Sequence, residues 1–358
     1  MTSNVDINAA SASPGPLGSL FQSMGEPHRF AKSRPESTRA PMNTVAIHNR
    51  RLMHLLERIA AAFNKAGLPL LVLKGGALQL ALPGLLNRRP MDDLDLLIHP
   101  ENLERARGLL AELGATPGAR HPCKDFCPRF HYEEEFILGS IYPVKIDLHV
   151  RPLRPLRYSR LVPPDALWSR AESARIGRAT IGVPAPEDML IHLAAHAAIH
   201  GCSREVWLRD ISLWTANHVN RLDWDGFLET AETWRLALPV LTGLRRAANQ
   251  FGEVCPARVL HRLEMMRVRW PDRLALWHAP RDKEYPLAHV LVNALCTPGW
   301  RFKIAYLRSI SIHRNRPSKA ARTQRPGVRN FLAEILRRPF SAWHKIPLRR
   351  RCADAVAG

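Results

Sequence analysis

The chain has 358 residues, of which 46% are hydrophobic, a composition typical of folded globular proteins and long enough for about two domains. No stretch approaches the ~20 continuous apolar residues of a membrane helix, and residues 1–33 lack the basic start and apolar core of a secretory signal. We therefore expect a cytoplasmic protein that does not span a membrane. Six scattered cysteines argue against a disulfide framework.

The charge is strongly basic, with 52 Lys and Arg against 32 Asp and Glu and a net charge of +20. This balance favours polyanionic partners: nucleotides, nucleic acid or an anionic membrane surface. Much of the excess lies in residues 311–358, which we interpret as a basic C-terminal tail. Residues 328–336 of this tail carry apolar side chains at helical spacing, which suits either contact with an anionic partner or packing on the preceding domain.

The first 150 residues predict a disordered segment followed by a small α/β unit. Residues 1–43 are rich in Pro and Ser, which favours disorder. Apolar periodicity and Gly or Pro boundaries then delimit one domain over residues 44–150. Its expected elements are helix 44–66, strand 68–74, a short helix after Gly76, strand 94–98, helix 100–113 and strands 131–138 and 144–150.

The rest of the chain predicts helices. Residues 151–164 are rich in Pro and Arg and are typical of a linker. Helical periodicity follows over 186–200, 204–217, 224–234 and 237–252 and continues to about 310. We therefore predict an α+β fold: a small mixed sheet flanked by helices, followed by an all-helical domain over residues 165–310.

Three aspartates are placed for chemistry. Asp93 and Asp95 begin one predicted strand, and Asp147 lies on another. Residues i and i+2 of a strand point to the same face, so Asp93 and Asp95 should project together, whereas Asp92 should face away. Grouped carboxylates repel one another unless a cation lies between them, and Mg²⁺ prefers carboxylate and phosphate oxygens. We predict a metal site at Asp93, Asp95 and Asp147.

The segments around these aspartates suit an anionic ligand. Gly75 and Gly76 allow close approach of the backbone at a helix N-terminus, where amide groups face anions. Lys74 precedes them and either contacts phosphate or ends the strand. Arg88 and Arg89 precede the aspartates, and a guanidinium group makes bidentate contacts with phosphate. His149 shares a strand face with Asp147 and either orients a ligand or is a half-buried structural histidine.

The order and spacing of these motifs resemble the polymerase-β-type nucleotidyltransferase superfamily, and within it the uncharacterised bacterial nucleotidyltransferase family proteins. The resemblance runs from about Leu52 to beyond Asp210. Its motifs are Lys74-Gly75-Gly76, Arg88 followed by Asp93-Leu94-Asp95, Ile146-Asp147-Leu148-His149, and a later helix with His192, His196 and His200 followed by Trp207-Leu208-Arg209-Asp210. Val150 stands where that group usually has tryptophan.

The resemblance implies transfer of a nucleoside monophosphate from an NTP to an unidentified acceptor hydroxyl, with release of pyrophosphate. It implies two Mg²⁺ ions held by Asp93, Asp95 and Asp147, and NTP phosphates held by Lys74, Gly75, Gly76 and an arginine from 88–89. The acceptor is left open: a small molecule, a peptide or protein, or nucleic acid. The alternative is a non-catalytic nucleotide- or nucleic-acid-binding regulatory protein of the same fold.

Two further groups have metal-ligating side chains. His192, His196 and His200 form one helical stripe, and a third hypothesis is therefore a metallohydrolase with an HxxxH motif. No Glu follows the first His as in HExxH metalloproteases, so the sequence disfavours this hypothesis. His121, Cys123, Cys127 and His131 lie within eleven residues but match no common zinc module. We expect the stripe to pack against the catalytic domain, and we leave the zinc question open.

Overall fold

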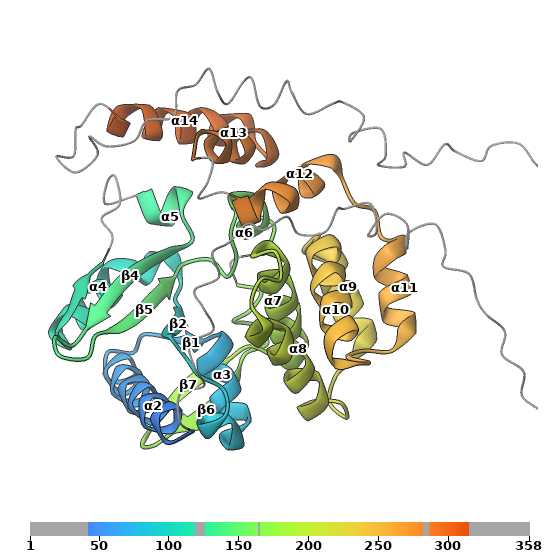
Figure 1. Cartoon of the computed structure of the whole chain (residues 1–358). Helices are drawn as coiled ribbons and strands as arrows, with labels where there is room; N and C mark the ends of the chain where they lie inside the picture. Colours follow the sequence, from blue (N-terminus) through green and yellow to red (C-terminus); the bar gives the residue numbers. More distant parts are fainter. Residues whose placement is uncertain (1–41, 119–125, 164, 282–285, 315–358) are drawn as a thin grey trace, which may run out of the picture. The chain divides into compact units, whose positions relative to one another are not determined.

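The computed structural model describes residues 42–118, 126–163, 165–281 and 286–314 (Figure 1). The strands of these residues form one mixed seven-stranded sheet. The strand order is β3-β4-β5-β2-β1-β7-β6, with β5–β2 and β1–β7 parallel and the other pairs antiparallel. The strands are β1 Leu71–Val72, β2 Asp93–Leu97, β3 Ala115–Pro117, β4 Glu133–Leu138, β5 Val144–His149, β6 Glu172–Ile176 and β7 Ala179–Val183.

Helices and their connecting loops make up the remainder of the described chain. This confirms the predicted α+β fold with a mixed sheet and a following helical region. The α-helices are α2 Met42–Lys65, α3 Lys74–Ala81, α4 Leu103–Glu112, α5 Phe126–Phe130, α6 Leu156–Ser159, α7 Pro186–Ile199, α8 Glu205–Asn217, α9 Trp224–Thr233, α10 Ala237–Phe251, α11 Ala257–Met265, α12 Trp270–His278, α13 Pro286–Cys296 and α14 Trp300–Arg314. Short 3₁₀ helices cover η1 Pro83–Asn87, η2 Pro100–Asn102 and η3 Ala279–Arg281.

Helix α2 shows how the apolar pattern builds the core. Leu52, Leu56, Ile59 and Phe63 recur at helical spacing and are all fully buried. Together they form one face, which packs on the sheet through β7, β6 and β2. Gly67, in the left-handed region at φ 62°, closes the helix as predicted and leads the chain into β1.

The sheet extends beyond the predicted domain boundary at residue 150. Strands β6 and β7 form a hairpin that places β7 beside β1, within the region that the sequence assigned wholly to helices. Gly177 at φ 54° and Arg178 form its two-residue connection. Inward and outward residues alternate along β7, so a period-2 signal was present, but it covers only five residues. The sheet is therefore completed by residues from both sides of the predicted linker.

The helical region is built around α7. Twelve of its fourteen residues are buried, and it packs against α8, α9 and α10. A helix that is apolar around most of its circumference belongs at the centre of a bundle. None of the helices in the described ranges has the length and apolar character needed to cross a bilayer.

The two ends of the chain were predicted to be a disordered segment and a basic tail. Helix α2 begins at Met42, and residues 1–41 lie outside the described residues. Helix α14 continues to Arg314, a few residues past the predicted start of the tail, and the rest of the tail also lies outside them.

Candidate active site

The three aspartates lie on neighbouring strands and face the same side of the sheet. Strand β2 pairs in parallel with β5, and the register places Asp95 opposite Asp147 and Asp93 opposite Lys145. Side chains at paired positions share a sheet face, so the predicted grouping of Asp93, Asp95 and Asp147 follows from this register. Asp95 and Asp147 are buried, whereas Asp93 is half-buried.

Asp95 is held by two cationic or hydrogen-bonding neighbours. Lys74 Nζ lies 2.5 Å from Asp95 Oδ1, and His149 Nε2 lies 3.0 Å from the same oxygen. Burial alone would raise the pKa of the Asp95 carboxyl, but the charge of Lys74 and the hydrogen bond from His149 hold it well below its usual range. Asp95 is therefore an ionised carboxylate with a fixed orientation.

Lys74 adopts an uncommon backbone conformation in making this contact. Its φ of 46° lies in the left-handed region, and it is the first residue of α3. Burial would lower its pKa, but the charge and hydrogen bond of Asp95 outweigh this and raise it. A left-handed lysine held by an ion pair is local strain of the kind that concentrates at functional sites.

Asp93 and Asp147 lack comparable compensation. Burial, followed by repulsion from Asp95, raises the pKa of Asp93 to about 6. Burial and the charge of Glu133 raise the pKa of Asp147, although Lys145 Nζ donates to Asp147 Oδ2 at 2.8 Å. Asp147 Oδ1 is buried and has no hydrogen-bond partner among the residues that the structure describes. A cation between the three carboxylates would relieve both the repulsion and the unpaired oxygen, and carboxylate oxygens are the ligand type that Mg²⁺ prefers.

This charged face extends further than the sequence analysis recognised. Lys145, Asp147 and His149 alternate along β5 on the face shared with Asp93 and Asp95, and Glu133 of β4 lies opposite His149. Glu133 Oε2 is 3.5 Å from His149 Nδ1. The alternation of Lys145, Asp147 and His149 was the available signal for Lys145. The position of Glu133 beside His149 depends on the pairing of β4 with β5, and the sequence does not determine that pairing.

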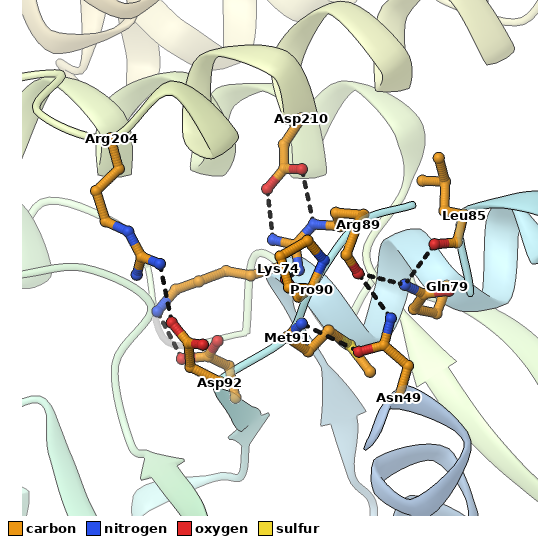
Figure 2. Close-up of polar contacts among 11 residues, drawn as sticks. Asn49, Lys74, Gln79, Leu85, Arg89, Pro90, Met91, Asp92, Arg204 and Asp210 are labelled. Carbon is orange, nitrogen blue, oxygen red and sulfur yellow. Dashed lines mark hydrogen bonds and ion pairs between the residues drawn. The ribbon is translucent and has the colours of Figure 1, made fainter. Parts of the chain in front are cut away.

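Arg89 has a different role from the predicted phosphate contact. Its guanidinium makes a bidentate contact with Asp210 of α8, with Nε–Oδ1 at 2.8 Å and Nη2–Oδ2 at 2.6 Å (Figure 2). Both side chains are buried. A Cβ atom added at Gly75 would lie 2.6 Å from Arg89 Nη1, so Gly75 makes room for this guanidinium. Arg89 thus joins the loop before β2 to α8.

Buried amides hold the same loop from the other side. Asn49 of α2 donates to the carbonyls of Leu86 and Arg89 and accepts from the backbone N–H of Met91. Gln79 Nε2 of α3 donates to the same carbonyl of Arg89 at 3.3 Å (Figure 2). Asn49 is a polar residue on the apolar face of α2, a signal that sequence reasoning had available and did not use. The loop that delivers Asp93 is therefore fixed by α2, α3 and α8.

Exposed charges mark the outer side of this loop. Asp92 is exposed and forms an ion pair with Arg204 at 2.9 Å (Figure 2). The Arg88 side chain is exposed, and its guanidinium makes no hydrogen bond or ion pair with the residues that the structure describes, although its backbone N–H donates to the carbonyl of Leu85 at 2.9 Å. It therefore remains available as the predicted phosphate ligand.

The histidine stripe of α7 packs beside this site. Positive charge on Lys74 contributes, after burial, to lowering the pKa values of His192 and His196, and that of His192 falls to about 3. The rings of His196 and His200 both contact Trp207 with centroids 5.0 Å apart, His196 edge to face at an interplanar angle of 84° and His200 tilted at 51°. His192 and His196 are therefore neutral, and both lie near enough to Lys74 to feel its charge.

The second group of candidate metal ligands is only partly described. His121 and Cys123 lie outside the described residues, whereas the Cys127 thiol and the His131 ring contact the backbone of Glu133. In the described ranges, no group of three or more His, Cys, Asp or Glu side chains is arranged to hold a metal ion.

The raised pKa of Asp93 predicts a stabilising substitution. The folded protein holds this proton up to about pH 6, whereas the unfolded chain releases it near pH 3.8, so the stability that Asp93 contributes is complete below pH 3.8 and is lost as the pH rises to 6. Asn mimics the neutral acid. We expect Asp93→Asn, in EDTA, to match the wild type near pH 3.8 and to exceed its unfolding free energy by about 2 to 3 kcal/mol at pH 7.5. Urea denaturation across this range measures the difference, and equal stabilities at pH 7.5 would contradict the repulsion.

Comparisons with solved structures give weak global similarity. Two structures of ANT(2'')-Ia, one in complex with adenylyl-2''-tobramycin, share 14% and 15% identity with this chain, each with a TM-score of 0.37. They cover 52% and 56% of this chain, and 99% and 96% of their own chains are matched. An antigenic nucleotidyltransferase-like protein from Paracoccidioides brasiliensis shares 16% identity over 62% of this chain and 96% of its own, again with a TM-score of 0.37. No curated protein matches.

The family comparison is more extensive. Residues 17–252, about two thirds of the chain, match the family described as "Uncharacterised nucleotidyltransferase". The match includes Asp93 and Asp95 of β2, Asp147 of β5, helix α3, and Asp210 of α8. It confirms the predicted resemblance. The chain belongs to this nucleotidyltransferase family.

Proposed function

We propose that this protein transfers a nucleoside monophosphate from an NTP to an acceptor hydroxyl, with Mg²⁺, and releases pyrophosphate. The observation that carries the proposal is the facing set of Asp93, Asp95 and Asp147. Two of them have raised pKa values, and one oxygen of Asp147 is buried without a hydrogen-bond partner in the described part of the chain. Since NTP and Mg²⁺ are both abundant in the cytoplasm, we assign the reaction to the cytoplasm.

The aspartates would hold two Mg²⁺ ions. Asp93 and Asp95 would hold both ions, and Asp147 would hold the ion that acts on the acceptor hydroxyl. Bound there, Mg²⁺ supplies positive charge that acidifies the acceptor hydroxyl and stabilises the pyrophosphate leaving group. The acceptor oxygen forms a bond to the α-phosphorus while the bond to the β-phosphate oxygen breaks. The acidified hydroxyl would release its proton to solvent as this bond forms.

The residues around the triphosphate have separate tasks. Lys74 and the amides of Gly75 and Gly76 begin α3, whose N-terminus has no side-chain cap and so can face phosphate. Arg88 would add a mobile cation, whereas Arg89 positions the loop. His149 orients Asp95 through its hydrogen bond. The acceptor stays open among small molecules, proteins and nucleic acid.

A panel of melting curves tests nucleotide and metal binding. Each NTP is added with and without Mg²⁺ at pH 7.5. We expect a rise in Tm that requires both components, because ligand at about 100 times its Kd stabilises by about 2.7 kcal/mol. Asp92→Asn, a neighbouring exposed acid, should respond as the wild type does, and Asp93→Asn should lose the Mg²⁺-dependent part. A full response in Asp93→Asn, or none in the wild type, would contradict the proposal.

A further inference from the structure

Helices α13 and α14, at the top of Figure 1, leave large apolar side chains in contact with solvent. Leu291 and Leu295 of α13 are 50% and 56% exposed, and Trp300 and Ile304 of α14 are 67% and 43% exposed. Each pair is spaced i, i+4, so each helix presents its pair as one stripe. Lys303 Nζ donates to the carbonyl of Leu295, which brings the end of α13 against the first turns of α14.

The opposite face of α14 is firmly packed. Tyr306 is buried in a small apolar cluster with Phe130, Leu156 and Ala294, against which Phe302 packs. The ring centroid of Phe130 lies 5.4 Å from that of Phe302 and 5.7 Å from that of Tyr306. Packing on this inner face sets the rotation of the helix, so the outward direction of Trp300 and Ile304 is a fixed feature of the fold.

The charge of this surface restricts what covers it. Helices α13 and α14 contain no Asp or Glu, and Arg301, Lys303 and Arg308 lie among the apolar residues. The sequence from 285 to 333 has nine Lys or Arg and no acid. A second copy of this face, or the basic tail of the same chain, would bring like charges together. The occupant that the charge favours is anionic.

The apolar residues distinguish between anionic occupants. Phosphate backbones of nucleic acid offer no apolar partner for Leu291, Leu295 and Ile304. A bilayer with anionic headgroups offers both parts: negative charge for arginine and lysine, and an acyl boundary for leucine, isoleucine and tryptophan. We propose that α13 and α14 dock this protein on an anionic membrane surface, as a peripheral contact that does not span the bilayer.

Flotation of the full-length protein with vesicles tests the proposal. Vesicles of phosphatidylcholine alone are compared with vesicles that also contain phosphatidylglycerol. We expect binding to the anionic vesicles only, and a fall of about tenfold in the partition coefficient for Trp300→Ser/Ile304→Ser. Both residues are exposed, so the variant should keep the wild-type Tm. Brominated acyl chains should quench the tryptophan fluorescence of the wild type more than that of the variant.

Two matched controls separate this surface from other contributions. Ile141→Ser removes an exposed apolar residue, 83% exposed, in the β4–β5 connection and should bind as the wild type does. Arg308→Glu should weaken binding, whereas Arg178→Glu in the β6–β7 turn should not. Absence of wild-type binding to anionic vesicles would overturn the proposal. Unchanged binding and quenching in Trp300→Ser/Ile304→Ser would also overturn it, because the basic tail alone would then account for the attraction.

Discussion

Replacing Asp93 with Asn should lower the rate of nucleotidyl transfer by about 10³-fold or more while the protein becomes more stable in the absence of metal. The activity falls because the variant loses a charged ligand for the cation that stabilises the transition state. The stability rises because the same substitution removes a carboxylate that burial and Asp95 disfavour. Opposite signs for activity and stability distinguish a functional acid from a structural one.

The matched control for this substitution is the adjacent acid. Asp92→Asn removes the same charge one residue earlier, at an exposed position that forms an ion pair with the exposed Arg204. It should retain most of the activity and change stability by less than about 1 kcal/mol. Initial rates and urea denaturation on the three proteins suffice. Equal rates in wild type and Asp93→Asn would reject the assignment of Asp93.

Breaking the Arg89–Asp210 pair should cause the second large effect. We expect Arg89→Met or Asp210→Leu to lower the unfolding free energy by about 3 to 5 kcal/mol, because each leaves a buried charged partner without its counterpart. The double variant Arg89→Met/Asp210→Leu should recover much of this loss, since an apolar pair can replace a buried ion pair. Urea denaturation of the singles and the double forms a complete thermodynamic cycle.

The chain supplies its own control for that experiment. Arg204 and Asp92 also connect α8 to the loop before β2, but in solvent, so Arg204→Met should cost no more than about 1 kcal/mol. If Arg89→Met and Arg204→Met lower the unfolding free energy equally, the buried ion pair contributes no more to stability than the exposed one. In that case the role assigned to Arg89 fails.

Much of the fold was predictable because its signals are local. The apolar spacing of α2 and the helices from α7 to α10 gave boundaries within about two residues. The i, i+2 spacing of Asp93 and Asp95 set their shared face, and the structure adds Asp147 through the β2–β5 register. The β6–β7 hairpin was missed because five-residue strands carry too short a pattern.

The site differs from the sequence prediction where a long-range partner decides. Arg89 has the chemistry of a phosphate ligand, and only the approach of Asp210, 121 residues later, shows that it is used within the fold. Likewise, the two glycines were predicted from phosphate binding. The structure gives them a packing reason as well, because an added Cβ would press on Arg89 at Gly75 and on Val72 at Gly76.

The most direct test of nucleotidyl transfer follows the label of an NTP. The full-length protein, Mg²⁺ and a fractionated cell extract as acceptor source are incubated with NTP labelled at either the α- or the γ-phosphate. Our account predicts that α-label enters a new product and γ-label leaves as pyrophosphate, with wild type and Asp92→Asn but not with Asp93→Asn or without Mg²⁺. Transfer of γ-label to the product, or equal α-label transfer by Asp93→Asn, would contradict it.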